Sequence, residues 1–543
     1  VRAGLTLTRA CAPLAFERLA LGGLDLPRSS VTLCPRDGAL LRLEQGAVRG
    51  GGTIGPIRLA GRLGSSPIGV TLQHGEWLLG ARRFAATGLG VRLGAPERVT
   101  RLDVATLGGS LAAGGLAGTF DGASGQIGAV PLLLSAAAGR WRFAANVLAL
   151  DGGLIVADSA ADPRFNPLAA RSVALTLADN RIAASGTLFE PSKSVKVADV
   201  TIAHDLGAGA GHANLTVAGI VFGPQFQPDA LTRLTYGVIA NVVGSVNGEG
   251  HIRWTPQGVT SDGVFRTPGT DLAAAFGPAT GIAGEVRFTD LLALESAPGQ
   301  VATIKTLNPG IAVNDGVVRY QLLRGTRIAV EQGRWPFAGG TLTLEPTLLD
   351  FDKTQERRMT FRVDGMRADQ FLQQFDFKNL NATGIFDGAL PMVFDTTGGR
   401  IEQGRLTVRP GGGTVAYVGE VTQKDVGFWG NFAFQALKSL RYRSLEIVMN
   451  GPLAGEMITE VRFAGIGQGA GAKRNFLFDR LQKLPLIFNV RISAPFRQLI
   501  DSAQSFYDPR RLIERNLPTL LEEQNKRAKP PTPIQPSDSR IVP

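Results

Sequence analysis

Short stretches of alternating apolar and polar residues, each ended by glycine, recur through this chain and restrict it to strands. In ATGIFDGALPMVFDTTGGRIEQGRLTVRPGGGTVAY, from Ala382 to Tyr417, no stretch is long enough for a helix. Alternation is typical of strands with one buried face, and glycine marks strand ends, bulges and tight turns. The 543 residues include 69 glycines, nearly twice the usual share of about 7%. The expected fold is therefore mainly β.

The alternation gives each expected strand one apolar face. RRMTFRVDG places Met359, Phe361 and Val363 on one side. RSVALTLADN does the same for Val173, Leu175 and Leu177. Polar residues occupy the opposite side, as in an antiparallel sheet with one face in water. Such a sheet must bury its apolar face. It could close on itself, pack as a sandwich, or leave a trough for lipid.

The chain is basic, with a formal net charge of +11. Basic proteins bind nucleic acid or anionic membrane surfaces more often than average. Here the basic residues are spread along strands, as in ERRMTFRV and SLRYRSL. A solvated outer face is the favoured interpretation, attraction to anionic lipid headgroups comes second, and nucleic acid is a distant third.

Few segments have a helical pattern. RADQFLQQF and NFAFQALKSL are short candidates, at 367–375 and 431–440. After Ala494 the sequence predicts two helices broken near Asp508–Pro509, followed by a Pro-rich disordered tail at 527–543. A loosely repeated strand start, ATGIAGEVRF at Ala279 and ATGIFDGALPMVF at Ala382, suggests one hairpin unit used many times.

No motif indicates an enzyme, a metal site or a cofactor. The histidines, His74, His204, His212 and His251, are far apart and lie outside any HExxH frame. GIGQGAGAKR at Gly465 lacks the GK[ST] ending of a phosphate loop, so a flexible hairpin loop is favoured. There is no GxSxG elbow. Trp335 is interpreted as core packing at a strand end, with a lipid contact as the secondary interpretation.

The two cysteines, Cys11 and Cys34, belong to no CxxC pair. In an oxidising compartment they could form one disulfide, and two buried thiols are the alternative. The chain begins at Val1 inside an expected strand, and no signal peptide or transmembrane run is visible in it. We expect it to be the C-terminal part of a longer protein.

Seven segments between about Gly223 and Pro509 resemble, in order, the C-terminal region of the YdbH family, which is related to the AsmA-like group with TamB and YhdP. They are GEGHIRWTPQGVTSDG, LLALESAPGQ, TLNPGIAVNDGVVRYQLL, GRWPFAGGTLTLEP, GIFDGALPMVF, LKSLRYRSLEIVMNGPLAGEM and LPLIFNVRISAPFRQLIDSAQSFYDP. The preceding residues match only in β character and in the LC pair.

The resemblance implies a Gram-negative envelope protein that reaches across the periplasm from an inner-membrane anchor, which this chain lacks. It implies a long antiparallel sheet curled into a U-shaped apolar groove that moves phospholipid to the outer membrane. A small outer-membrane lipoprotein is expected at the C-terminal end. The expected divisions are 1–222 and 223–507, both groove, and 508–543, a helical segment and tail.

Alternation and resemblance together yield a set of candidate groove residues. These are Ile252, Trp254, Val286, Phe288, Leu342, Leu344, Met359, Phe361, Val363, Leu406, Val408, Leu445, Ile447, Met449, Val461, Phe463, Phe488, Val490 and Ile492.

Two alternatives to lipid conduction remain open. An open strand edge could pair with client strands, as in a TamB-like scaffold for outer-membrane protein assembly. Transport of a dicarboxylate, an older label of the family, fits poorly because a small anion needs convergent basic groups and gains nothing from an apolar trough.

Overall fold

The computed structural model describes residues 5–495 with gaps. The gaps are 22–23, 37, 45–46, 65, 96–98, 113, 129, 237, 275–276, 309–311, 352–355, 375–379, 396–397, 418–439, 454–455, 466 and 469–487.

Strands make up most of the described chain, as the alternation predicts. Those of the first part are β1 (Leu5–Leu7), β2 (Ala12–Leu21), β3 (Leu24–Pro35), β4 (Leu41–Glu44), β5 (Ala47–Arg49), β6 (Gly51–Ile54), β7 (Ile57–Leu63), β8 (Ser66–Leu72), β9 (His74–Leu78), β10 (Arg83–Leu93), β11 (Thr100–Ala112), β12 (Gly115–Gln126), β13 (Leu132–Ala144), β14 (Val147–Asp158), β15 (Leu168–Ala178), β16 (Arg181–Glu190), β17 (Val195–Asp205) and β18 (Ala210–Phe222).

Two single-turn 3-10 helices, η2 (Pro228–Ala230) and η3 (Arg233–Thr235), precede the second part. Its elements are β19 (Ile239–Thr255), β20 (Gly258–Ala274), β21 (Gly277–Asp290), β22 (Glu295–Ser296), β23 (Gln300–Leu307), β24 (Val313–Leu323), β25 (Arg327–Phe337), β26 (Gly340–Leu344), β27 (Thr347–Asp350), β28 (Arg357–Arg367), α1 (Ala368–Gln374), β29 (Leu380–Ala382), β30 (Ile385–Asp395), β31 (Gly398–Val408), β32 (Gly413–Tyr417), β33 (Leu440–Tyr442), β34 (Ser444–Pro452), β35 (Glu456–Ala464), β36 (Gly467–Gln468) and β37 (Phe488–Pro495).

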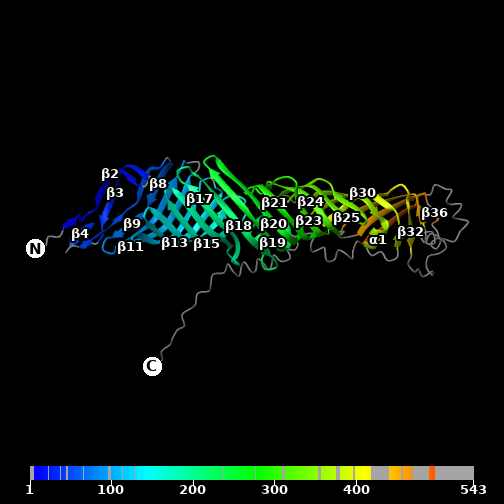
Figure 1. Ribbon diagram of the computed structural model, residues 1–543, viewed down its shortest axis with the longest axis horizontal. Helices are drawn as coiled ribbons and strands as arrows, with labels where there is room; N and C mark the ends of the chain where they lie inside the picture. The colour runs from blue at the N-terminus through cyan, green and yellow to red at the C-terminus, as the bar shows by residue number, and fades with distance from the viewer. Residues whose placement is uncertain are drawn as a thin grey trace, which may run out of the picture.

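Nearly all long strands belong to one antiparallel sheet whose ladders follow chain order from β2 to β37. Local circuits arise where a strand is interrupted: β6 and β7 both pair with β3, and β8 and β9 both pair with β10. Among the described residues no ladder joins β2 to β37, so the sheet is open. It extends along the long axis of the molecule, with strands crossing that axis obliquely (Figure 1).

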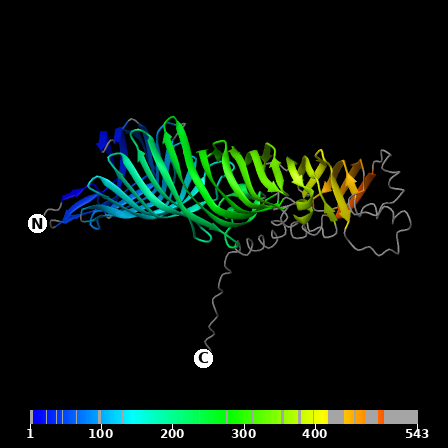
Figure 2. The same ribbon diagram turned by 45° about the vertical axis from the view of Figure 1, so that its right-hand side comes forward.

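Bulges bend the strands into the expected U. Gly122, Ala136, Ser172, Gly365 and Gln403 have positive φ angles of 50–70° in mid-strand, and each lies where the strand pairing shifts register. An extra residue on one strand increases local bending and twist. The strands of the wide N-terminal half are visibly arched (Figure 2).

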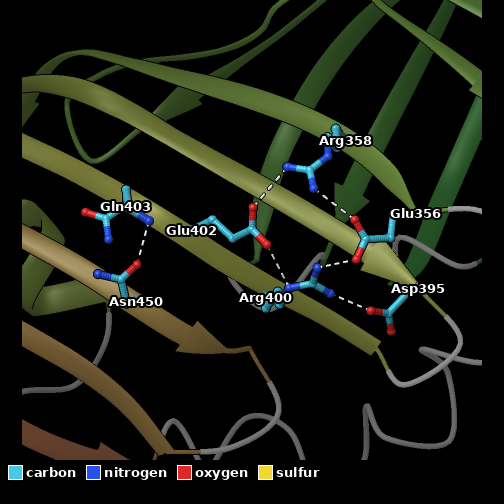
Figure 3. Close-up of polar contacts among 7 residues, drawn as sticks. All are labelled: Glu356, Arg358, Asp395, Arg400, Glu402, Gln403 and Asn450. Atoms are coloured by element: carbon cyan, nitrogen blue, oxygen red, sulfur yellow. Dashed lines mark hydrogen bonds and ion pairs between the residues drawn. The ribbon is translucent and has the colours of Figure 1, made fainter.

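At two of these bulges a backbone N–H group has no partner in the strand ladder. Each donates a hydrogen bond to a side chain on a neighbouring strand. The Gly365 N–H donates to Asp387 Oδ1 at 2.8 Å. The Gln403 N–H donates to Asn450 Oδ1 at 2.6 Å, as Figure 3 shows. Bulges occupied by Ala, Ser and Gln show that glycine is not required at every bend.

Only one of the expected helices lies within the described residues. The candidate at 367–375 is confirmed as α1, with Asp369 in its first turn. Residues 431–439 of the second candidate, the expected C-terminal helices and the tail lie outside the described residues, and Leu440 begins β33. No helix in the described ranges is long and apolar enough to cross a membrane. The β18–β19 ladder crosses the division expected at residue 222, which stays a proposal.

The structure joins Cys11 and Cys34 through a disulfide, with their Cα atoms 4.0 Å apart. The pair lies beside the first rung of the β2–β3 ladder, Ala12 with Leu33. We predict that the bridge forms in protein exported to an oxidising compartment. Peptide mass mapping under non-reducing conditions should find both cysteines in one linked peptide. Two alkylatable thiols in periplasmic material would contradict it.

Candidate functional site: the inner apolar face

Register places the candidate groove residues on one face of the sheet. Directly opposed residues of an antiparallel pair lie on the same side. Val318 opposes Gly333, Gly333 opposes Leu344, Leu344 opposes Phe361, and Phe361 opposes Leu390. We call this side the inner face.

Sixteen of the candidates fall on the inner face, and their side chains differ in how far they are buried. Val286 and Phe288 on β21 are half-buried, and Phe288 packs edge-on against Phe265. Ile447, Met449 and Val461 are partly buried against the core. The fully buried candidates are Ile252, Trp254, Leu342, Leu344, Met359, Phe361, Val363, Leu406, Val408, Leu445 and Phe463.

The remaining three candidates lie on β37 and are placed by backbone register alone. Phe488 opposes Phe463, Val490 opposes Val461, and Ile492 opposes Thr459. The lipid-lining role of the whole set stays a proposal.

Toward the C-terminal end the inner face is a packed core. Met359, Phe361 and Val363 are 5%, 3% and 1% exposed, and they belong to one hydrophobic cluster that extends from β21 to β35. Trp335 lies in the same cluster at 1% exposure, which confirms its interpretation as core. In this region the apolar side chains cover one another, and the sequence pattern alone did not distinguish that arrangement from an open trough.

The N-terminal half presents the same face in a more open form. Phe84, Gly109, Gly118 and Trp141 form a register row across four strands. Leu150 and Leu175 continue the row on β14 and β15. It connects to Ile252 through Ala184, Ile202 and Ala213. Phe84, Leu150 and Leu175 are only half-buried, so their apolar surface is partly open to solvent.

Glycines one or two strands away make room for inner-face tryptophans. A Cβ at Gly109 would lie 2.6 Å from the Trp141 ring, and one at Gly211 would lie 2.6 Å from the Trp254 ring. Gly52 and Gly316 leave the same space beneath Trp77 and Trp335. Aromatic rings over glycines shield backbone that lacks a side chain. Sequence reasoning missed Trp77, Phe84 and Trp141 as inner-face residues; their signal was an aromatic residue among glycine-rich strands.

The outer face carries the charge, as the solvated-face interpretation of the basic composition predicts. Cross-strand pairs such as Arg140–Asp151 and Arg266–Glu285 recur along it. Their side chains are half or more exposed, apart from Glu285. Exposed pairs of this kind contribute about 0–1 kcal/mol each.

The densest outer-face cluster lies where β28, β30 and β31 meet (Figure 3). Arg358 contacts Glu356 and Glu402, and Arg400 contacts Glu356, Asp395 and Glu402. The hydrogen bond from Arg400 lowers the pKa of Glu356. Val393, directly opposed to both Arg358 and Arg400, is 1% exposed beside the cluster.

His74 lies on β9, whereas His204, His212 and His251 lie on the adjacent strands β17, β18 and β19. Burial lowers the pKa of His204. The Trp254 Nε1–H donates to His204 Nδ1 at 3.0 Å. In the described part of the chain, no three His, Cys, Asp or Glu residues are grouped as metal ligands would be.

A long open sheet with a continuous apolar inner face and a charged outer face defines the class of β-groove proteins. The model of the YdbH-like family, described as intermembrane phospholipid transport protein YdbH, matches residues 4–518. The chain therefore belongs to the YdbH-like family, and the resemblance found in its C-terminal segments extends over nearly its whole length. The same comparisons found no matching curated protein and no matching solved structure.

Proposed function

We propose that this chain conducts phospholipids across the periplasm to the outer membrane, with their acyl chains held along its inner face. The supporting observation is the more open part of the inner face, where Phe84, Leu150 and Leu175 are half-buried. Strand register connects it from Phe84 on β10 to Ile252 on β19. Family membership supports phospholipid transport as the role. No chemical step is required, so the proposed role is non-catalytic.

The energetics explain why an apolar track is useful. An acyl chain exposed to water costs about 0.8 kcal/mol per methylene. Two chains of about fifteen methylenes therefore cost on the order of 20 kcal/mol. A face such as the one around Phe84, Leu150 and Leu175 replaces water along the path and removes most of that barrier.

The dimensions suit a bridge between membranes. About 25 strand positions, spaced about 4.8 Å apart, give a sheet on the order of 120 Å long. An inner-membrane anchor is the proposed attachment that fixes one end in the envelope. Mass spectrometry of lipids that co-purify with the chain tests the proposal: phospholipid should be present, and lipid-free protein from cells would contradict it.

The C-terminal edge is the proposed docking place for a small outer-membrane lipoprotein. Among the described residues, β37 pairs with β35 and with no other strand. An unpaired edge recruits a further strand. The same observation favours the second candidate function, a scaffold that pairs with client strands during outer-membrane protein assembly. The sequence places the expected docking region at Ala494–Tyr507, and residues 496–507 of it lie outside the described residues.

We predict that photo-cross-linkers at Asn489 or Arg491 trap a small lipoprotein in intact cells. The control is Thr343 on β26, an interior strand that pairs with both β25 and β28. It should yield only adducts within the chain. Adducts with outer-membrane protein clients at the edge would favour the scaffold function. Only internal adducts at Asn489 and Arg491 would show that the edge is already covered.

A further inference from the structure

The two rims of the groove meet near its middle. Neighbouring strands alternate in direction, so β12, β14 and β18 all end on one rim, which we call the first rim. β17, β19 and β21 end on the opposite, second rim. Contacts between loops from different rims therefore close the mouth of the groove.

An arm formed by residues 158–166 extends from the first rim after β14. The Asp158 side chain is fully buried and accepts four hydrogen bonds from the arm: from the Ala160 N–H, the Arg164 N–H and two guanidinium nitrogens of Arg164, at 2.6–3.0 Å. Burial alone would raise the Asp158 pKa, but these hydrogen bonds outweigh it and lower the pKa to about 2. The arm therefore keeps its ion pair at neutral pH.

The arm is also tied to the loop that follows β18 on the same rim. The Asn166 side-chain amide donates to the carbonyls of Asp229 and Ala230 at 2.9 and 3.0 Å. The Thr232 hydroxyl donates to the Arg164 carbonyl. The base of the arm is thus fixed before it reaches across.

Arg164 spans the mouth. Its third guanidinium nitrogen donates to the Leu292 carbonyl at 2.6 Å, although the two residues are 128 positions apart. Leu292 lies in the turn after β21, on the second rim. The Ser261 hydroxyl holds that turn, because it accepts the Leu292 N–H at 2.9 Å and donates to Asp290 at 2.7 Å.

An apolar contact accompanies the hydrogen bond. Val130, in the first-rim loop after β12, is 5% exposed. It belongs to the same buried cluster as Ala213, Ile252 and Trp254 at the second-rim ends of β18 and β19, and Leu292 packs against that cluster. Polar and apolar contacts together make a clasp, which we define as Val130, Asp158, Arg164 and Leu292.

We propose that this clasp is a gate for lipid headgroups. The inference rests on the proposed function. In a groove that holds acyl chains, the polar headgroup travels at the mouth, because burying it without partners is costly. The closed clasp occupies the mouth, so a headgroup passes only when the rims separate. Four hydrogen bonds secure Asp158 to the arm and one crosses to Leu292, so the clasp opens where Arg164 meets Leu292 and where Val130 packs against the second rim.

The decisive experiment bridges the clasp in the full-length protein within permeabilised cells. Cysteines replace Asp162 on the arm and Ala293 beside Leu292, and a short bis-maleimide joins them; Cys11 and Cys34, joined to each other, do not react. Benzoylphenylalanine probes at Phe84 and Val318 report phospholipid on the inner face on either side of the clasp. Bridging should lower the adducts at one probe at least tenfold and leave the other unchanged.

Equal adducts at both probes after bridging would overturn the gate. Adducts at neither probe in the unbridged protein would overturn the proposed function, and the gate with it, so the two failures are distinguishable. A second measurement follows the rate at which the bis-maleimide joins the two cysteines. Arg164→Gln should slow bridging at least threefold because the rims separate, whereas Arg181→Gln, which alters an exposed pair with Asp205, should not. Equal bridging rates in both variants would count against the clasp.

Discussion

Phe361→Glu should unfold the C-terminal half of the sheet. Phe361 is 3% exposed in a continuous hydrophobic cluster and packs against Trp335, with ring centroids 6.2 Å apart. Burying an unpaired carboxylate there removes packing and desolvates a charge, an expected loss of roughly 4 kcal/mol or more. Thermal denaturation, followed by circular dichroism, measures it.

Arg362→Gln is the matched control, one residue along on the outer face. Arg362 is mostly exposed and pairs with Glu345, so its loss should cost about 1 kcal/mol or less. From sequence alone the Phe361 substitution had two outcomes, a stable protein with a blocked trough or an unfolded one. Because Phe361 is buried, we expect the second outcome, an unfolded protein. A fully stable Phe361→Glu protein would show that the side chain faces an open trough.

Leu175→Glu should lower lipid occupancy at least tenfold while the protein stays folded. Leu175 is half-buried on the inner face of the more open N-terminal half, opposite Leu150. Its carboxylate can reach water when no lipid is present, so the expected loss of stability is about 1 kcal/mol. An acyl chain passing this point would have to cover an unpaired charge, at a cost of several kcal/mol. Co-purified phospholipid should fall at least tenfold.

Thr176→Glu is the control for Leu175→Glu because the next residue along the strand lies on the exposed outer face. It should leave both lipid content and stability unchanged. Unchanged lipid in a folded Leu175→Glu protein would exclude this part of the face as the path. Loss of lipid in both variants would point to a nonspecific effect of charge.

Alternation predicted the faces of β28, β31 and β34 because a strand repeats every two residues whatever it packs against. The sheet class and its inner face therefore followed from the sequence. The N-terminal row was harder to find, because on one side Phe84 and Trp141 are opposed by glycines, Gly109 and Gly118. Each has an apolar partner only on its other side.

Three features of the structure could not be predicted from the alternation pattern. The bulges at Ala136 and Ser172 shift register without a glycine to mark them. The clasp depends on Arg164 and Leu292 meeting across two rims, which is a consequence of strand number and curvature rather than of local sequence. Burial at Phe361 is a third case, because alternation shows that a face is apolar but not what covers it.

The central claim is that acyl chains lie on the inner face, and cross-linking in intact cells tests it most directly. Benzoylphenylalanine is placed at Leu150 on the inner face or at Ala149, its neighbour on the outer face. After irradiation, mass spectrometry identifies adducts on the purified protein. We expect phospholipid adducts at position 150 and at least tenfold fewer at position 149. Equal labelling at the two positions, or no lipid at 150, would contradict it.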